Sequence, residues 1–303
     1  MRGGMMKPCF ILVMCTWICA FWAPSMAQSQ EKIVKMSTTS STLASGLLDV
    51  LLPAFEKENG IKVKVIAKGT GAALRDGMDG NVDVIFVHAE KREEKFIQEG
   101  FGTKRYAVMH NDFVILGPSN DPAEIKGLSD AAQALKKIAT AKVSFVSRGD
   151  DSGTHTKEQA LWRSTGLSLE NKTSIIMKKG KKKEIDFVHP AGLGDWYQSI
   201  GQGMGKALTF ADEKQTYILA DRGTYIKYKF GRDVPIELDV LCEGDPKLKN
   251  PYGIIPINPK KHPHVNHAWA ETLAQWLISE RGQKLIKGYQ LHGKPLFYPD
   301  AIK

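Results

Sequence analysis

The chain has 303 residues, of which 42 are Lys or Arg and 33 are Asp or Glu, so its formal net charge at pH 7 is +9. Hydrophobic residues make up 42% and charged residues 25% of the chain, a composition that excludes disordered, collagen-like and disulfide-scaffold proteins. At roughly 150 residues per domain, the length indicates about two domains or one large α/β unit.

Residues 1–27 have the pattern of a secretory signal peptide. Two basic residues precede an apolar run at 9–22, and small residues at Ser25 and Ala27 form a cleavage site. The run is short for a membrane span, although a retained N-terminal anchor is the alternative. We therefore expect a mature chain that begins at Gln28 and resides in a Gram-negative periplasm.

The cysteines agree with that compartment. Three of the four lie in the predicted leader, so the mature chain keeps only Cys242 and cannot form an internal disulfide. A single thiol is compatible with a bacterial periplasm and unlike cysteine-rich eukaryotic secretion. No later stretch reaches 18 consecutive apolar residues, so we expect the mature chain to be soluble.

Strands alternate with helices in the first part of the mature chain. Apolar residues from Leu43 to Phe55 recur every three or four positions, as on one buried helix face, and Asn59–Gly60 ends that helix. We also expect strands at 32–36, 61–66 and 82–87, a helix from Ala72, and a charged surface helix at 91–99. This alternation predicts a parallel sheet covered by helices on both faces.

A second α/β series lies between two strands that contain Pro and Gly, at 111–118 and 250–259. Within the series we expect helices at 129–139 and 205–214, a loop followed by a helix over 147–164, and strands at 143–146 and 217–220. A helix at 265–279 is predicted to close the chain. Two strands that bound an internal series indicate two lobes joined by two hinge crossings, with a ligand site between them.

The expected domains follow from this pattern. Lobe 1 comprises residues 28–115 and 254–303, and lobe 2 comprises residues 116–253 with a basic insertion around 170–190. The segment 171–183 holds six lysines and no acid, which predicts a solvated loop or hairpin tip. Contact with an anionic partner, a membrane or a nucleic acid, is the alternative for this segment.

Three turns share one design. Residues 37–40, 69–71 and 147–154 are rich in Ser, Thr and Gly, and each follows a predicted strand and precedes a predicted helix. The free N–H groups at a helix start bind anions, and Gly allows close approach. Each turn alone is better explained as a helix cap. Together, and with the permanent charge of Arg148, they predict an oxyanion site.

Several motifs resemble those of the tungstate-binding periplasmic components of ABC transporters. They span nearly the whole mature chain and are Thr38–Ser40, Val108–Phe113, Phe145–His155, Gly201–Gly205, Asp221–Tyr225, Glu243–Asp245 and Asn250–Tyr252. The resemblance implies a two-lobed type II periplasmic binding protein, each lobe a mostly parallel sheet flanked by helices. It also implies a monomer that captures tungstate, or molybdate, for a membrane permease and its ATPase, without catalysis, cofactor or nucleic acid.

The resemblance assigns the oxyanion contacts to hydroxyl and N–H groups of the three turns and to the arginine. The assigned residues are Thr39, Ser40, Thr70, Arg148 and Thr154. Secondary candidates in the same turns are Thr38, Gly71, Ser152 and Gly153. The sequence departs from the family pattern in its first turn, which begins at Ser37, and in the inserted lysine-rich segment after Leu169.

Other functions remain open at this stage. Monohydrogen phosphate needs an acceptor for its proton, and Asp150 or Asp151 would supply one, so a phosphate- or sulfate-binding protein of the same fold is the second hypothesis. If both aspartates point away, the site favours a fully deprotonated dianion. A hydrolase using Ser152 and His155 is a remote alternative without a Gly-x-Ser-x-Gly motif. The histidines 262, 264 and 267 predict surface capping in preference to a metal site.

Overall fold

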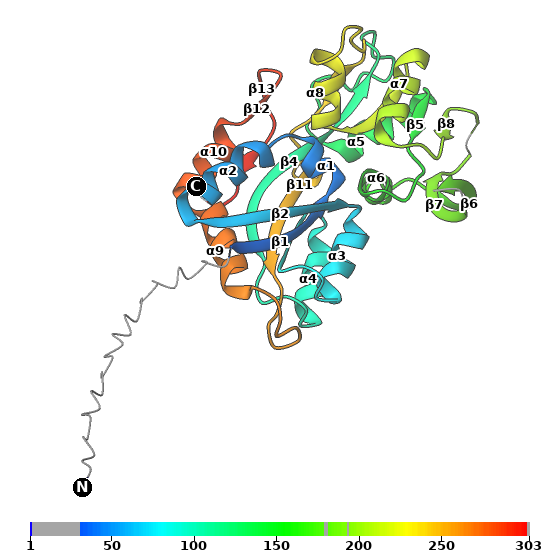
Figure 1. Ribbon diagram of the computed structural model, residues 1–303. Helices are drawn as coiled ribbons and strands as arrows, with labels where there is room; N and C mark the ends of the chain where they lie inside the picture. Colours follow the sequence, from blue (N-terminus) through cyan, green and yellow to red (C-terminus); the bar gives the residue numbers. More distant parts are fainter. Residues whose placement is uncertain (2–30, 179–180, 193, 302–303) are drawn as a thin grey trace. The chain divides into compact units, whose positions relative to one another are not determined.

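The computed structural model describes residue 1 and residues 31–178, 181–192 and 194–301. Most of the predicted signal peptide and its cleavage site fall in residues 2–30, outside this described part. Among the described residues, no helix is long and apolar enough to cross a membrane. Figure 1 shows the arrangement of helices and strands.

Three parallel strands form one half of the main sheet, in the order β2-β1-β3. The elements of this half are β1 (Lys32–Thr39), α1 (Ser40–Ala44), α2 (Leu48–Asn59), β2 (Ile61–Lys68), α3 (Thr70–Met78), β3 (Val84–Val87) and α4 (Glu90–Gln98). The predicted alternation of strands and helices is confirmed here. Because the strands are parallel, their carboxyl ends lie at one edge, where the first two predicted turns also lie.

The single helix predicted from Leu43 is wrong. The segment forms two helices, α1 and α2, separated by Gly46, whose φ of +80° belongs to the left-handed region that glycine tolerates. Leu43, expected on the buried face, is 43% exposed because it lies on the short α1. The apolar stripe begins instead at Leu47 and continues through α2, which ends as predicted before Gly60.

Two antiparallel strands connect the two halves of the sheet. β4 (Tyr106–Gly117) starts five residues before the predicted strand and pairs with β11 (Lys249–Pro256) as far as Asp112. From Phe113 onward β4 pairs instead with β9 (Tyr217–Asp221), and its end also pairs with β10 (Asp239–Cys242). β11 in turn pairs with β3. The change of partner at Asp112 marks the point where the chain passes between the two halves.

The second half of the sheet is again partly parallel. β5 (Phe145–Ser147) pairs in parallel with β9 and with β8 (Tyr197–Ser199). The remaining elements of this half are α5 (Ala131–Ala141), α6 (Gly153–Arg163), α7 (Met204–Lys214), α8 (Arg222–Phe230) and the short 3₁₀ helix η1 (Pro246–Leu248). The complete order β2-β1-β3-β11-β4-β9-β5-β8 thus contains two parallel groups joined by antiparallel strands.

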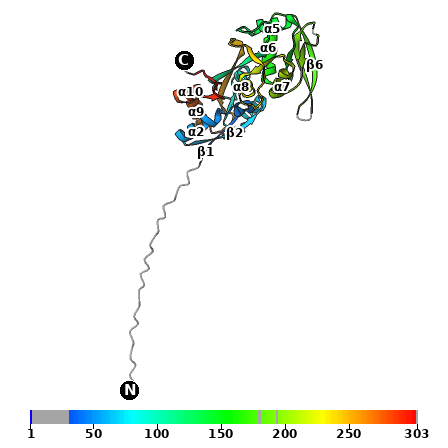
Figure 2. The same ribbon diagram turned by 90° about the horizontal axis from the view of Figure 1, so that it is seen from above.

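The lysine-rich segment forms a β-hairpin. β6 (Leu169–Lys178) and β7 (Lys181–Pro190) pair as a separate two-stranded antiparallel sheet beside α6 (Figure 2). Ile185 and Phe187 are buried, whereas Ile175 is 63% exposed on the opposite face. The lysines therefore cluster toward the end of a hairpin, which is one of the two forms predicted.

The chain does not close with the helix predicted at 265–279. After α9 (His267–Ile278) come α10 (Glu280–Gly288), β12 (Gln290–Leu291), β13 (Lys294–Pro295) and β14 (Tyr298–Pro299). Ser279 ends α9 and also caps α10, because its hydroxyl accepts the N–H of Gly282. β14 pairs with β4, so the C-terminal segment adds to the main sheet.

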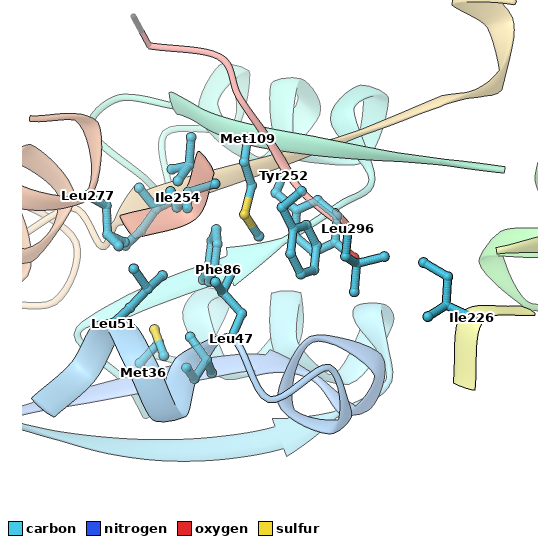
Figure 3. Packing of buried hydrophobic residues seen from close by; sticks show 14 of the residues in the cluster. Met36, Leu47, Leu51, Phe86, Met109, Ile226, Tyr252, Ile254, Leu277 and Leu296 are labelled. Atoms are coloured by element: carbon cyan, nitrogen blue, oxygen red, sulfur yellow. The ribbon is translucent and has the colours of Figure 1, made fainter. Parts of the chain in front are cut away.

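Three clusters of buried side chains hold the described part of the fold together. The larger one contains Met36, Leu51, Phe86, Ile254 and Leu277, contributed by β1, α2, β3, β11 and α9 (Figure 3). A second cluster contains large residues of α5, β5, α6 and β9, namely Leu135, Phe145, Trp162 and Tyr217. A third cluster contains Leu74 of α3, Phe96 of α4 and Ile255 of β11. Each fully buried apolar side chain contributes about 1.5–3 kcal/mol relative to exposure. These clusters fix the strand ends that carry the three turns.

Candidate functional site

The first turn joins β1 to α1. Thr39 is the N-cap of α1, and its Oγ1 accepts the N–H of Thr42 at 3.1 Å. Thr38 is fully buried and donates its hydroxyl to the carbonyl of Phe86 at 2.6 Å, so that hydroxyl holds β3 to β1. Ser40 is exposed, and its Oγ lies 3.3 Å from the carbonyl oxygen of Lys68. The hydroxyls of Thr39 and Ser40 therefore line the edge where β1 and β2 end.

The second turn joins β2 to α3 and lies beside the first. Gly69 is the N-cap of α3, and among the described residues no side chain caps this helix. The N–H groups of Thr70 and Gly71 open the helix, where the dipole favours an anion. A Cβ added to Gly71 would lie 3.0 Å from Nη2 of Arg92. The guanidinium of α4 thus adds positive charge next to this turn.

The third turn joins β5 to α6 and contains the arginine. Arg148 donates from Nη1 to Oγ1 of Thr154 at 3.0 Å and from Nη2 to Oδ2 of Asp150 at 2.7 Å. Its Nε is buried and has no hydrogen-bond partner among the described residues. A buried donor without a partner is costly unless a ligand satisfies it.

Local bonds fix the shape of this third turn. Ser152 is the N-cap of α6, and its Oγ accepts the N–H of His155 at 3.2 Å. Gly149 has φ +56°, and a Cβ there would lie 2.0 Å from Oγ of Ser199. Any other residue at position 149 would therefore be strained by the left-handed φ and would meet the side chain of Ser199. Gly153 opens the helix as its first residue.

The predicted site residues therefore fall in two sets. Thr39, Ser40 and Thr70 occupy adjacent turns in one parallel group of strands, and Arg148 and Thr154 occupy one turn in the other group. Among the described residues, no hydrogen bond joins one set to the other. The secondary candidates lie in the same turns, and two of them, Thr38 and Ser152, use their hydroxyl oxygens to hold the local structure.

His88 is a residue of this region that the sequence did not reveal. It follows β3 directly, and its Nε2 lies 3.1 Å from Oγ1 of Thr39 and 3.2 Å from Oγ of Ser41. Its Nδ1 lies 3.1 Å from Oδ1 of Asn250, and burial lowers the pKa of the ring. One indication of His88 was present in the sequence, namely its place directly after the strand at 82–87, which ends at the same edge of the sheet as the first two turns.

Arg222 occupies the passage between the two halves of the sheet. Its Nε and Nη2 donate to the two carboxylate oxygens of Asp112, both at 2.6 Å, and Nη2 also reaches Glu243 at 2.6 Å. A bidentate pair of this kind is directional as well as strong. The pair holds α8 against β4 at Asp112, where β4 changes partner, so we assign Arg222 a structural role.

A buried carboxyl lies behind the arginine turn. Glu158 of α6 accepts hydrogen bonds from Nε1 of Trp162 at 3.1 Å and from the hydroxyl of Tyr197 at 2.8 Å. Burial raises the pKa of Glu158 to about 7. The carboxyl is therefore sensitive to pH in the neutral range, and the charge of Asp150 in the third turn adds to the rise of its pKa.

The geometry gives no support to a hydrolase or a metal site. Ser152 contacts the backbone of His155, whose ring Nδ1 instead accepts the N–H of Asp151 at 3.2 Å, so the pair is a helix cap and not a nucleophile with its base. The histidines 262, 264 and 267 each direct one ring nitrogen to a backbone carbonyl. No group of three or more metal-binding side chains occurs among the described residues.

Comparison with known proteins points to one family. The model of the PBP superfamily domain matches residues 26–281. The tungstate-binding protein TupA of Peptoclostridium acidaminophilum is 45% identical over 280 residues, covering 91% of this chain and 88% of that protein. The residues that the family model matches include all three turns.

Two solved structures are similar to this chain over most of their length. The tungstate-binding protein TupA from Desulfovibrio alaskensis G20 is 41% identical with a TM-score of 0.79, covering 89% of this chain and 100% of that chain. The tungstate ABC transporter structure from Geobacter sulfurreducens is 48% identical with a TM-score of 0.68, covering 86% and 99% of the two chains.

Proposed function

The chain belongs to the PBP superfamily and, within it, to the family of the TupA tungstate-binding proteins, and we propose that it captures tungstate for an ABC permease and its ATPase. The proposal places the mature protein in the periplasm, with molybdate as a second ligand and without catalysis. Thr39, Ser40, Thr70, Arg148 and Thr154 are the proposed contacts.

The buried N–H of Arg148 carries the proposal. Arg148 is 14% exposed, already pairs with Asp150, and keeps its Nε without a partner among the described residues. A tetrahedral dianion supplies acceptor oxygens for this donor and a second negative charge for the guanidinium. The open N-terminus of α3 supplies donors from the other half of the sheet.

Capture requires the two sets of contacts to meet on one ligand. We propose that the two predicted lobes close by bending at the crossing, where β4 changes partner after Asp112. Closure brings Arg148 and the start of α6 over the turns of β1 and β2. Exclusion of water then strengthens the charge-assisted hydrogen bonds, and the closed form is the one that a permease recognises.

The arrangement of Asp150 favours a fully deprotonated dianion over phosphate. Its Oδ2 accepts from Arg148 at 2.7 Å, and its Oδ1 accepts the N–H of Ser152 at 3.3 Å. Both oxygens are thus engaged within the turn, and the carboxylate of Asp151 belongs to an exposed residue. Tungstate, molybdate and sulfate need donors alone, whereas monohydrogen phosphate needs an acceptor. Among these dianions, the names of the relatives favour tungstate.

Calorimetric titration of the chain beginning at Gln28 tests this proposal. The ligands are sodium salts of tungstate, molybdate, sulfate and phosphate, at one pH and ionic strength. We expect tight 1:1 binding of tungstate, binding of molybdate, and much weaker binding of sulfate and phosphate. Tight phosphate binding without tungstate binding would overturn the proposal in favour of a phosphate-binding protein.

A further inference from the structure

His88 connects the first turn to the strands that cross between the two halves of the sheet. One ring nitrogen faces the hydroxyls of Thr39 and Ser41, and the other faces Asn250 of β11. Asn250 donates from Nδ2 to Oδ1 of Asn111 at 2.7 Å, and the two asparagines are register partners on β11 and β4. An unbroken chain of hydrogen bonds therefore runs from the crossing to Thr39.

The direction of this chain sets the tautomer of His88. Because Nδ2 of Asn250 donates to Asn111, its Oδ1 faces the ring and accepts, so Nδ1 of His88 carries a proton. In the neutral ring Nε2 is then an acceptor, and it accepts a hydrogen bond from the hydroxyl of Thr39 or Ser41. The ring orientation is held by stacking on Tyr252, with centroids 4.6 Å apart.

A neutral His88 and a bound oxyanion both need a hydrogen bond from the same hydroxyl groups, so they compete for it. Thr39 has one hydroxyl proton. Its Oγ1 already accepts the N–H of Thr42 and also lies 2.6 Å from the hydroxyl oxygen of Thr42 and 3.0 Å from that of Ser41. If that proton points to His88, Thr39 offers an incoming oxyanion only lone pairs. Protonation of Nε2 reverses this bond, because the ring then donates and no longer competes with the ligand for the hydroxyl proton. The imidazolium also adds a positive charge near the first turn.

We propose that His88 is a positioning residue of the tungstate site, which becomes protonated when the dianion binds and thereby directs the Thr39 and Ser41 hydroxyls toward it. This inference rests on the proposed function. His88 acts through the two hydroxyls, so its role differs from that of the proposed contacts. The same protonation leaves the bond from Nδ1 to Asn250 in place, so the link to the crossing persists in the bound form.

The surroundings of His88 are compatible with a ring that is neutral when free and charged when bound. Burial lowers the pKa of the ring, and the bond to Asn250 and the charge of Asp221, at the end of β9, raise it. The phenol of Tyr252 stacks on the ring, and burial also raises the pKa of that phenol, so it stays uncharged. Along the chain, Glu90 and Lys91 are the nearest charged residues, at the start of α4. A bound dianion would therefore add the largest new charge facing the ring.

The test compares tungstate titrations of the wild-type chain and His88→Gln from pH 6 to 9, in two buffers of different ionisation enthalpy. For the wild type we expect net proton uptake on binding and a Kd that rises with pH, by at most about tenfold per pH unit for one linked proton. His88→Gln should bind tungstate without proton uptake at position 88, and its Kd should depend less on pH than that of the wild type. His264→Gln is the matched control, since this histidine hydrogen-bonds Gly80 in another part of the fold, and it should keep the wild-type profile.

A second measurement on the wild type does not depend on the folding of a variant. Nitrogen-15 NMR of the histidine rings should show His88 as the Nδ1–H neutral tautomer without tungstate and as an imidazolium with tungstate at the same pH. Tight tungstate binding with an unchanged His88 ring, or equal proton uptake in His88→Gln, would overturn this inference alone. Absence of tungstate binding at every pH would instead overturn the proposed function, and this inference with it.

Discussion

Replacement of Arg148 by Ala is expected to weaken tungstate binding by two to three or more orders of magnitude. The substitution removes the unpartnered Nε donor and the counter-charge at a position that is 14% exposed. Hydrogen bonds to charged groups are worth about 1.5–3 kcal/mol, and loss of one partner of a buried ion pair costs about 3–5 kcal/mol. At about 1.4 kcal/mol per factor of ten, a loss of about 3–5 kcal/mol corresponds to a Kd raised by roughly 10² to 10³·⁵.

The same substitution also leaves Asp150 without its arginine, so binding and stability must be separated. Asp150 is 11% exposed and 2.7 Å from Nη2 of Arg148, and a largely buried carboxylate that loses its counter-charge destabilises the fold. We expect the double variant Arg148→Ala/Asp150→Asn to recover thermal stability but not affinity. Calorimetric titration and thermal unfolding of both variants measure the two quantities. A Kd within about threefold of wild type, or recovery of tight binding in the double variant, would refute the role given to Arg148.

Three further predictions concern stability and reactivity. Gly149→Ala should lower the free energy of unfolding by about 1–3 kcal/mol and weaken tungstate binding, because φ is +56° and the new Cβ meets Ser199. An unchanged melting temperature of the variant would contradict this prediction. Burial raises the pKa of Glu158 from 4.5 to about 7, so ionisation of Glu158 costs stability as pH rises through that window. As pH rises from 5 to 8, the free energy of unfolding of Glu158→Gln should therefore increase relative to that of the wild type by about 1–3 kcal/mol. Equal pH profiles of unfolding for the two proteins would show that the pKa of Glu158 is not raised by burial. Cys242 is fully buried with its pKa raised to about 12, so the chain beginning at Gln28 should react with a thiol reagent only after unfolding, and rapid reaction of the native protein would be the contrary result.

Periodicity predicted the elements whose pattern is local. The helix at 91–99 and the strand at 217–220 were located to within a residue or so of α4 and β9, because one face of each is set by its own sequence. The failures have local causes as well. Gly46 interrupts an otherwise continuous apolar stripe, and Ser279 starts a helix at the point where another one ends. A single residue with a special conformation or a double capping role leaves no periodic signal.

The site was predictable in part. Turn chemistry located the three turns, because Ser, Thr and Gly at a strand-to-helix junction indicate both capping and anion binding. The contact of His88 with Asn250 was not predictable, since the two residues are 162 positions apart and neither belongs to a motif that predicts the other. The orientation of Asp150 could not be predicted from the sequence either. It depends on the ion pair with Arg148 and on one local hydrogen bond from the N–H of Ser152.

The most direct test of the account is the position of tungsten in crystals of the chain grown with tungstate, located by anomalous diffraction. We expect one strong tungsten peak, with the oxygens of tungstate within hydrogen-bond distance of Arg148 in one half of the sheet and of Thr39 and Thr70 in the other. A peak that contacts only one of these sets, or lies away from both, would contradict the claim that one oxyanion is held between the three turns.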